Sequence, residues 1–388
     1  MEKNILRVKL IAKPDHSLNL INNKKLFSDK GISMEVETLN AAKKNSLLKK
    51  LVPKISTVNK DVKISYFLTF CAHINRFFLK HGFDTGRLFY SICDRYYMAK
   101  AKSVYDIVHS WPMFYYSHTE ENCIHLSDCY ELNPRYVEGI YKKEYQKYGF
   151  KYDSKVLYRN YHNYKTILDS KLVVTPSKLV VDSYRGEVSK DRFVINPYGA
   201  LGLTYNPSPI DLNEKRVFAF VGRVCLEKGI GTLLDVSEML KGHSVEFLVI
   251  GPVDRHVREL LKTRELDNCR FLGAIPKNEV LKKITQADFF IMPSLSDAYC
   301  MAVMEALSVG LPSIVSSRTG CSNEIVTHEM GMIYDVDDVD ELCSKIISFS
   351  NMSLEQYEIY RDNIKKYFER EFVDNYVSRT ADLYNSLR

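Results

Sequence analysis

A glycine and two permanent cations follow a predicted strand near the middle of this 388-residue chain. The apolar run Arg216–Val221 predicts the strand, which ends in Gly222 and is followed by Arg223 and Lys228. Gly222 allows a tight turn and the close approach of a ligand. An Arg side chain can bind two phosphate oxygens at once, and a Lys ammonium acts as a point charge. The loop therefore suits a diphosphate, although two basic residues are also common in a solvated loop between a strand and a helix.

Two carboxylates follow a second predicted strand, Phe289–Met292, and are eight residues apart. Asp297 is expected in the loop after this strand, and Glu305 is expected one turn into a helix that begins near Met301. A carboxylate such as Glu305 can accept hydrogen bonds from the two hydroxyls of a ribose ring. The alternative for Glu305 is a capping or surface glutamate.

The start of the same helix supplies hydrogen-bond donors. The backbone amides of Cys300, Met301 and Ala302 precede the first intrahelical hydrogen bonds. Free amides at a helix N-terminus form an anion site that suits a phosphate. Ligands of doubly wound sheets bind at the carboxyl ends of the strands, where both of these loops would lie.

The order and spacing of these motifs resemble those of retaining glycosyltransferases of family 4, which have the GT-B fold. The family pattern is a V-G-R…K-G loop, a P-S strand end, and Glu-x7-Glu running into E-A-x-A-x-G-x-P. The likeness covers roughly Arg216–Asp340, with a weaker echo in Val173–Gly199. The matching positions here are Gly222-Arg223, Lys228-Gly229, Pro293-Ser294, Asp297, Glu305-Ala306, Gly310 and Pro312.

The resemblance implies a role for each matched residue. In the family, the first carboxylate lies against the transferred sugar and the second holds the ribose, roles that fall here on Asp297 and Glu305. Arg223 and Lys228 would neutralise the leaving diphosphate. With side-chain cations and helix amides at this position, no metal and no cofactor beyond the UDP- or GDP-linked sugar donor is expected. The other residues expected to line the donor site are Gly222, Ser294, Cys300, Met301 and Ala302.

The sequence departs from the family pattern inside the donor motif. Asp297 replaces the first glutamate and is one methylene shorter. The usual Gly-Phe-Gly that follows is Ala298-Tyr299-Cys300, which adds side chains where backbone amides must approach the ligand. These changes support a second hypothesis, an inactive GT-B-like partner or scaffold protein. A nucleotide-dependent oxidoreductase is disfavoured because no Gly-x-Gly-x-x-Gly follows the first predicted strand.

Two histidines near predicted strand ends are further candidates for the catalytic site. His109 follows the run Asp106-Ile107-Val108, and His125 precedes Asp128 by three residues. Some members of the family that this sequence resembles carry a functional histidine at a strand end. A histidine beside an aspartate could contact the transferred sugar or tune proton transfer. The alternative for each is a histidine that is hydrogen-bonded within the core.

Two further residue patterns have weaker functional interpretations. Both Asp-x-Asp sequences, Asp335-Val336-Asp337 and Asp338-Val339-Asp340, lie after the donor motifs, and we interpret them as a solvated turn and a helix cap rather than a metal site. Several tyrosines near the expected cleft could stack on sugars, although 26 tyrosines make some clustering expected. These tyrosines are Tyr115, Tyr116, Tyr130, Tyr136 and Tyr141.

Charge is divided unevenly between the two halves of the chain. Residues 1–200 contain 33 Lys and Arg against 20 Asp and Glu, a net charge of +13, and residues 201–388 contain 21 against 28, a net charge of −7. A basic half suits an anionic membrane surface. The run Lys43–Lys54 pairs lysines with apolar residues at helical spacing, which predicts a surface-bound helix or a solvated helix of the first domain. Nucleic-acid binding is not expected because no such motif occurs.

The N-terminal sequence and the cysteines indicate the compartment. Met-Glu-Lys-Asn has no apolar h-region, and no apolar window is long enough to span a bilayer. The nine cysteines include no Cys-x-x-Cys pair, as expected for free thiols in a reducing compartment. We therefore expect a cytoplasmic protein that can bind peripherally to a membrane.

Short apolar runs alternate with amphipathic stretches, which predicts an α/β protein of two doubly wound, Rossmann-like domains facing each other across a cleft. The expected units are a basic, acceptor-side domain over 1–200, a Pro-rich linker over 201–214, a nucleotide-sugar-binding domain over 215–353, and C-terminal helices over 354–388 that return to the first domain. The other predicted strands are Ile5–Ile11, Val62–Phe67, Ile107–His109, Cys123–Leu126, Leu172–Thr175, Phe193–Ile195, Val245–Ile250, Arg270–Leu272 and Pro312–Val315. The predicted helices are Gly231–Leu240, Arg255–Thr263, Lys277–Thr285, Met301–Val309 and Leu354–Leu387.

Taken together, the residues and the resemblance predict a metal-independent glycosyltransferase of the hexosyltransferase type, and the resemblance alone implies that it retains the anomeric configuration. Its donor would be a nucleotide-diphosphate sugar, and its acceptor a saccharide or a lipid-linked molecule. Surface polysaccharide, lipopolysaccharide or glycolipid synthesis is the expected process.

Overall fold

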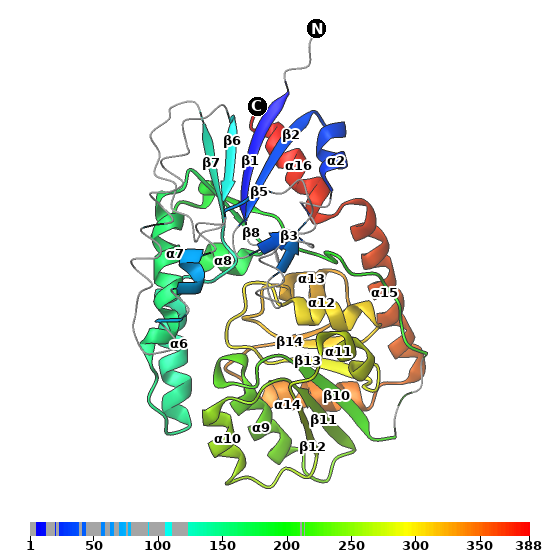
Figure 1. The fold of residues 1–388 in the computed structure, drawn as a ribbon. Coiled ribbons are helices and arrows are strands. Elements are labelled where there is room, and N and C mark those ends of the chain that lie inside the picture. The colour runs from blue at the N-terminus through cyan, green and yellow to red at the C-terminus, as the bar shows by residue number, and fades with distance from the viewer. Residues whose placement is uncertain are drawn as a thin grey trace.

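Two parallel β-sheets, one in each half of the chain, organise the computed structural model (Figure 1). The structure describes residues 5–12, 20, 23–38, 41–43, 56–58, 63–65, 70–74, 77–78, 92, 105–110, 123–209, 212 and 214–388. Sheets of this kind have apolar strands because helices cover both faces. The predicted pair of Rossmann-like domains is confirmed.

The first sheet has seven strands in the order β5-β2-β1-β6-β7-β8-β9, all paired in parallel. Its central strands are short apolar runs whose side chains are buried, and β1 pairs with both β2 and β6. The strands are β1 (Leu6–Ala12), β2 (Ile32–Thr38), β5 (Lys63–Ile64), β6 (Ile107–Ser110), β7 (Ile124–Asp128), β8 (Leu172–Thr175) and β9 (Phe193–Ile195). A separate two-stranded ribbon joins β3 (Ala41–Lys43) to β4 (Ser56–Val58).

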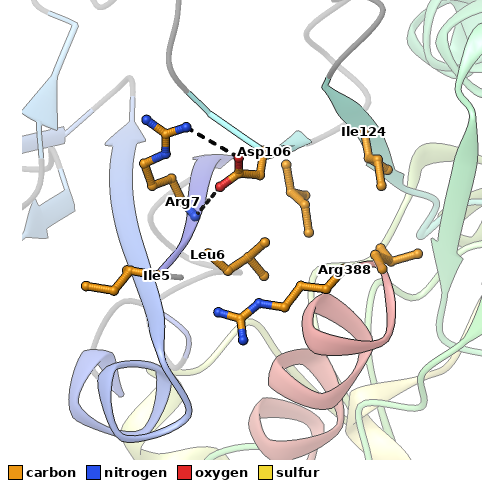
Figure 2. Close-up of a pocket in the computed structure, with 8 residues that line it drawn as sticks. Ile5, Leu6, Arg7, Asp106, Ile124 and Arg388 are labelled. Atoms are coloured by element: carbon orange, nitrogen blue, oxygen red, sulfur yellow. Dashed lines mark hydrogen bonds and ion pairs between the residues drawn. The ribbon is translucent and has the colours of Figure 1, made fainter. Parts of the chain in front are cut away.

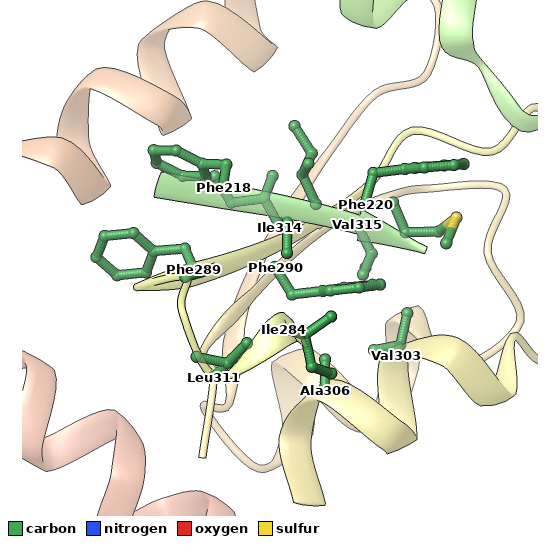
Figure 3. Packing of buried hydrophobic residues seen from close by; sticks show 14 of the residues in the cluster. Phe218, Phe220, Ile284, Phe289, Phe290, Val303, Ala306, Leu311, Ile314 and Val315 are labelled. Atoms are coloured by element: carbon green, nitrogen blue, oxygen red, sulfur yellow. The ribbon is translucent and has the colours of Figure 1, made fainter. Parts of the chain in front are cut away.

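The second sheet has six parallel strands in the order β12-β11-β10-β13-β14-β15. Its centre is a layer of phenylalanines from β10 and β13, packed on the helix that follows β13 (Figure 3). Phe218 and Phe289 stack with ring centroids 5.1 Å apart, and both are fully buried. The strands are β10 (Arg216–Val221), β11 (Val245–Ile250), β12 (Cys269–Gly273), β13 (Phe289–Met292), β14 (Ser313–Ser316) and β15 (Gly331–Tyr334).

Helices connect these strands and cover both sheets (Figure 1). In the first half they are α2 (Lys24–Asp29), α6 (Pro134–Lys147), α7 (Tyr158–Asp169) and α8 (Lys178–Ser183). In the second half they are α9 (Ile230–Met239), α10 (Arg255–Leu261), α11 (Lys277–Ile284), α12 (Met301–Ser308), α13 (Ser322–Thr327), α14 (Val339–Ser350), α15 (Leu354–Val373) and α16 (Tyr376–Ser386). Short 3-10 turns are η1 (Ser154–Leu157), η2 (Lys190–Arg192) and η3 (Leu226–Lys228).

The chain returns to the first domain within its C-terminal helices, but the return begins after the predicted residue 354. Tyr357, Ile364 and Phe368 of α15 belong to the core of the second domain. Tyr376 and Tyr384 of α16 belong to the core under β1 and β2. The long helix predicted over Leu354–Leu387 is therefore two helices. Asn375 separates them, because its side chain accepts hydrogen bonds from the amides of Val377 and Ser378 at 3.0 Å and caps α16.

Most predicted strands are present within one or two residues, but several elements were missed. Strand β2 alternates polar and apolar residues with a charged Glu at two positions, and β15 contains Gly and Met, so neither has a strong apolar signal. Only Lys63–Ile64 of the predicted strand Val62–Phe67 pairs in the described part of the sheet. The predicted basic helix Lys43–Lys54 lies largely outside the described residues, and Lys43 ends strand β3 instead of beginning a helix.

Candidate functional site

The loops after β10 and β13 are pressed together at the carboxyl edge of the second sheet. Gly229 has a left-handed backbone, with φ +71°, and a Cβ there would lie 1.8 Å from the carbonyl oxygen of Pro293. The amide of Leu295 also donates to the carbonyl of Glu227 at 3.1 Å. Only glycine fits at position 229, because any side chain would overlap the backbone of the neighbouring loop. The K-G pair of the sequence motif therefore exists to bring these two loops into contact.

Gly222 makes a similar close approach to the loop after β11. Its amide donates to the carbonyl of Ile250 at 3.0 Å, and a Cβ on Gly251 would lie 1.7 Å from the carbonyl oxygen of Gly222. Gly222 thus lies at the expected place, directly after β10 and beside the neighbouring strand end. Three successive strand ends, of β11, β10 and β13, are packed into one edge.

Lys228 and Asp297, which the sequence placed 69 residues apart, form an ion pair across the two loops. Their side chains are 29% and 17% exposed, so the pair faces an opening but is mostly shielded from water. Burial is the largest single influence and lowers the pKa of Lys228, but the Asp297 carboxylate, with smaller contributions from Cys300 and Tyr141, raises it, and the net pKa lies above its usual value. Asp297 is held in turn, because its carboxylate accepts from the amide of Tyr299 at 3.1 Å. Asp297, the carboxylate expected beside the transferred sugar, and Lys228, one of the two cations expected at the diphosphate, are therefore in direct contact.

Arg223, the other expected cation, points along the same edge without joining this pair. Its side chain is 55% exposed, and its guanidinium lies 3.6 Å from the carboxylate of Glu227. Glu227 is buried and also accepts a hydrogen bond from Tyr145 at 3.0 Å. Arg223 keeps exposed donors that a ligand phosphate could use, whereas its link to Glu227 limits how far it can move.

The start of α12 lies beside the ion pair and carries unused hydrogen-bonding groups. Within the described part of the chain, the amides of Cys300, Met301 and Ala302 have no hydrogen-bond acceptor. Glu305 is half-buried, and its carboxylate likewise accepts no hydrogen bond from the described residues. Burial raises the pKa of the Glu305 carboxyl, and the charge of Lys277 opposes this shift. An anion site and a free carboxylate thus lie one helical turn apart.

Cys300 occupies a backbone position that favours glycine. It lies directly before α12 with φ +74° and ψ +79°, and it is one of two non-glycine residues with positive φ among those described. Its side chain is 7% exposed. Left-handed backbone costs an L-residue about 1–2 kcal/mol, which a glycine avoids. The departure from glycine therefore keeps the expected backbone turn but adds strain and a buried thiol.

Ser294 does not face the opening. Its hydroxyl is fully buried and donates to the carbonyl of Ser296 at 3.2 Å. The hydroxyl therefore shapes the loop through this bond, and the place of Ser294 in the donor site stays a prediction.

The two candidate histidines both lie inside the first domain. His109 is fully buried and its ring nitrogens contact the hydroxyl of Tyr384 at 2.7 Å and the carboxylate of Asp128 at 3.2 Å. His125 is 3% exposed and bonds Ser110 at 2.8 Å. Asp128 pairs with His109, whereas the sequence suggested His125. Both contacts fit histidines that are hydrogen-bonded in the core: His109 joins α16 to the first sheet, and His125 joins strands β7 and β6 within it.

The acidic turn after β15 is a turn and a helix cap, as predicted. Asp338 caps α14 by accepting from the amide of Glu341 at 2.8 Å, and Asp335 accepts from the amide of Asp337 at 3.1 Å. Arg318 pairs with Asp337 at 2.6 Å. Across the described ranges, no group of three or more His, Cys, Asp or Glu side chains is arranged to hold a metal ion.

Helix α6 of the first domain reaches the candidate site through Tyr141, which was expected near the cleft, and through Tyr145, which was not. Figure 1 shows α6 descending beside the second domain. Tyr141, Tyr145 and Tyr148 follow one another at helical spacing and bond Ser296, Glu227 and Asp235 respectively. Their spacing of four and three residues places them on one face of a helix, and this was the sequence signal for a shared contact surface. Of the other suggested tyrosines, Tyr115 and Tyr116 lie outside the described residues.

A pocket separate from the candidate site lies in the first domain, at the amino ends of the strands of the first sheet (Figure 2). It has a volume of about 570 Å³ and is formed at the amino ends of β1, β6 and β7, next to Arg388. Arg7, which lines it, bonds Asp106 through its backbone amide at 2.7 Å and its guanidinium at 3.4 Å. Ligands of parallel sheets bind at the carboxyl ends of strands, so this pocket is not the expected donor site.

Comparisons with known proteins agree with this geometry. The family described as "Glycosyl transferases group 1" matches residues 207–367. The putative colanic acid biosynthesis glycosyltransferase WcaL of Escherichia coli is 22% identical over 217 residues, which are 52% of this chain and 53% of WcaL. The chain thus spans about half the length of this curated relative.

Solved structures resemble nearly the whole chain. Sucrose-phosphate synthase from Thermosynechococcus elongatus has a TM-score of 0.63 at 17% identity, covering 98% of this chain and 99% of that one. Anabaena Alr3699/HepE, solved in complex with UDP and glucose, has a TM-score of 0.58 at 14% identity, covering 98% and 100%. At these identities the likeness shows the fold alone, and that fold is GT-B.

The strained backbone at Cys300 gives a stability test. Cys300→Gly should be more stable than Cys300→Ala by about 1–2 kcal/mol, because both lose the thiol but only glycine relieves the left-handed strain. The measurement is the free energy of unfolding in urea. Cys343, buried within α14, is the matched control, where Gly should be less stable than Ala by about 1 kcal/mol. The same order of stability at both sites would show that Cys300 is not strained.

Proposed function

We propose that this chain transfers a sugar from a nucleotide-diphosphate donor to a saccharide or lipid-linked acceptor, and the match of residues 207–367 to the group 1 glycosyltransferases supports this proposal. The observation that carries the proposal is the meeting of four groups at one sheet edge. These are the Lys228–Asp297 ion pair, the exposed guanidinium of Arg223, the free carboxylate of Glu305 and the free amides at the start of α12.

Each group fits one part of a nucleotide sugar. The free amides and Arg223 would bind the diphosphate, because both donate hydrogen bonds to anionic oxygens. Glu305 would accept from the ribose hydroxyls, and Asp297 would lie toward the transferred sugar. Lys228 would neutralise charge that develops on the leaving phosphate, since a cation that binds the transition state more tightly than the ground state raises the rate.

We further propose that the reaction needs no metal and retains the anomeric configuration. The first part is supported by cations and amides that can together replace a divalent ion at the diphosphate. The second follows from the resemblance of the Asp297-x7-Glu305 motif to retaining enzymes. UDP and GDP remain equal candidates for the nucleotide, because the base would contact residues outside these motifs.

Surface polysaccharide, lipopolysaccharide or glycolipid synthesis is the process we propose. The likeness to WcaL, whose name refers to colanic acid, supports an acceptor of this class. The described part of the chain contains no disulfide, and its eight cysteines fit a reducing compartment such as the cytoplasm. Acceptors of this kind are often anchored in a membrane, so the enzyme would act at the cytoplasmic surface.

A membrane contact through the first domain is part of this proposal. That half has a net charge of +13, and four apolar side chains near its surface lie at helical spacing. Phe70, Ile74, Phe77 and Phe78 are 64%, 41%, 59% and 39% exposed. Basic charge with exposed aromatic residues is the combination that binds an anionic lipid surface. No helix in the described ranges has both the length and the apolar character needed to cross a bilayer.

An inactive partner or scaffold protein is the second candidate function. The observation that favours it is the replacement of glycines by Ala298 and Cys300 beside the anion site, together with the shorter Asp297. Such a protein would keep the fold, and it would fail to turn over any nucleotide sugar.

Donor binding tests the proposal through Glu305. Glu305→Ala should weaken binding of UDP or GDP by roughly 30-fold or more, since losing charge-assisted hydrogen bonds costs about 2–4 kcal/mol. Titration calorimetry with EDTA present measures this and tests metal independence together. Glu329, an exposed glutamate that follows α13, supplies the matched control variant Glu329→Ala. Equal nucleotide affinity in wild type and Glu305→Ala would remove Glu305 from the site.

Vesicle binding tests the membrane contact. The protein should bind vesicles of phosphatidylcholine and phosphatidylglycerol, and binding should fall between about 0.05 and 0.5 M salt as screening increases. Phe70→Ser with Phe77→Ser should weaken binding at both salt concentrations, because the apolar contribution is not screened. Ile359→Ser, on α15 of the acidic half, is the control for an exposed apolar residue. Sedimentation that is equal for neutral and anionic vesicles would contradict the electrostatic part.

A further inference from the structure

Three segments of the first domain hold the loop that carries Asp297. The hydroxyls of Tyr141, on α6, and Ser296 share a hydrogen bond of 2.5 Å. Ser177, which caps α8, donates to the carbonyl of Ala298 at 2.7 Å. The amide of Gly199 donates to the hydroxyl of Tyr299 at 2.8 Å. These contacts from the first domain fall on residues 296, 298 and 299, on both sides of Asp297.

The other side of the loop is fixed by the second domain. The amide of Asp297 donates to the carbonyl of Arg318 at 3.0 Å, and its carbonyl accepts from Gly320 at 2.8 Å. A Cβ on Gly320 would lie 1.9 Å from the carbonyl oxygen of Ala298 and 2.8 Å from the hydroxyl of Ser177. The loop is therefore packed tightly against both domains at Ala298, while the side chain of Asp297 stays 17% exposed.

We propose that Tyr141 and Ser177 are positioning residues that hold the Asp297 loop in the shape required for sugar transfer. The proposal rests on the proposed function, because it assumes that Asp297 faces the transferred sugar. Neither residue would touch the donor. Tyr141 would act through the side chain of Ser296 and Ser177 through the backbone of Ala298, so that docking of the first domain completes the geometry of a site built on the second.

The surroundings of Tyr141 support a stable contact of this kind. Burial raises the pKa of the Tyr141 hydroxyl to about 12, so it stays protonated and able to share its hydrogen bond at neutral pH. The same helix is fixed lower down, where Lys147 and Tyr148 bond Asp235 at 2.9 and 2.7 Å. Tyr148 therefore makes a hydroxyl contact between domains that resembles the Tyr141 contact but lies away from the Asp297 loop. It offers a matched control.

The test compares Tyr141→Phe, Ser296→Ala and the double variant with Tyr148→Phe as control. The first readout is hydrogen exchange of the amides in 294–300, measured without any substrate. The second is kcat and donor KM with a nucleotide sugar that the wild type turns over. Tyr141→Phe should speed exchange in 294–300 at least about threefold and lower kcat about 5- to 10-fold, with donor KM within about twofold. The double variant should match the single variants, because both remove one shared hydrogen bond.

A second pair of variants tests the role of Ser177. Ser177→Ala should speed exchange in the same loop, and Ser177→Thr, which keeps the hydroxyl, should restore the wild-type exchange rate. Tyr148→Phe should leave both exchange in 294–300 and kcat within about twofold of wild type. A change in Tyr148→Phe equal to that in Tyr141→Phe would show a general loss of docking and would overturn the proposal.

The outcomes separate this inference from the proposed function. Wild-type exchange and kcat in Tyr141→Phe and Ser296→Ala would overturn the inference while leaving the enzyme assignment intact. A fall in kcat without faster exchange would also overturn it, since Tyr141 would then act by another route. If the wild type turns over no nucleotide sugar but exchange rises only in the Tyr141 and Ser296 variants, the proposed function fails and the control of loop shape by the first domain is supported.

Discussion

The absence of a side chain at position 229 is the constraint on which the candidate site depends. The carbonyl oxygen of Pro293 occupies the space where a Cβ of Gly229 would lie. This contact brings the loop after β10 against the loop after β13, and Lys228 reaches Asp297 as a result. A larger residue would force one of the two loops to shift, because its Cβ would lie 1.8 Å from that carbonyl oxygen, and we expect the contact between cation and carboxylate to weaken.

The ion pair also determines how the site would meet an anionic ligand. Because Lys228 is paired with Asp297, we expect Arg223 and the free amides of α12 to supply most of the attraction for a bound diphosphate, and Lys228 to act on the charge that develops as the diphosphate leaves. Burying charged groups is costly unless each has a partner, and here Glu227 has both Tyr145 and Arg223 while Asp297 has Lys228 and the amide of Tyr299. The arrangement is electrostatically complete without ligand, yet it leaves donors and one carboxylate, Glu305, for a ligand to use.

The two domains are linked by more than the connection between them. Helix α15 belongs to the core of the second domain and α16 to that of the first, so the C-terminus ties them together. Helix α6 makes the reverse connection by placing three tyrosines on the second domain. The loop that carries Asp297 lies where these connections meet. Buried His109 contributes to the same framework, because it joins Tyr384 of α16 to Asp128 of the first sheet.

Much of the fold and part of the site could be predicted from the sequence, for local reasons. Buried parallel strands are continuous apolar runs, so β8, β10, β11 and β13 were predicted to the residue. The glycines, the position of Glu305 in α12 and the acidic cap at Asp338 follow from spacing along the chain. Strand β2 and the break between α15 and α16 were missed, because a mixed polar pattern and a single capping Asn375 give weak local signals.

Contacts between distant segments were decided by tertiary structure alone. The sequence suggested that Asp128 pairs with His125, but strand pairing and the return of α16 place His109 beside it. Ser294 matched a motif, but the turn of the loop buries its hydroxyl. The meeting of Tyr141 with Ser296 joins residues 155 apart in the chain. The Tyr141–Ser296 pair depends on how the two domains dock, and the His109–Asp128 pair depends on which strands lie side by side in the first sheet. Both are set by the shapes of whole surfaces, which no local pattern of residues encodes.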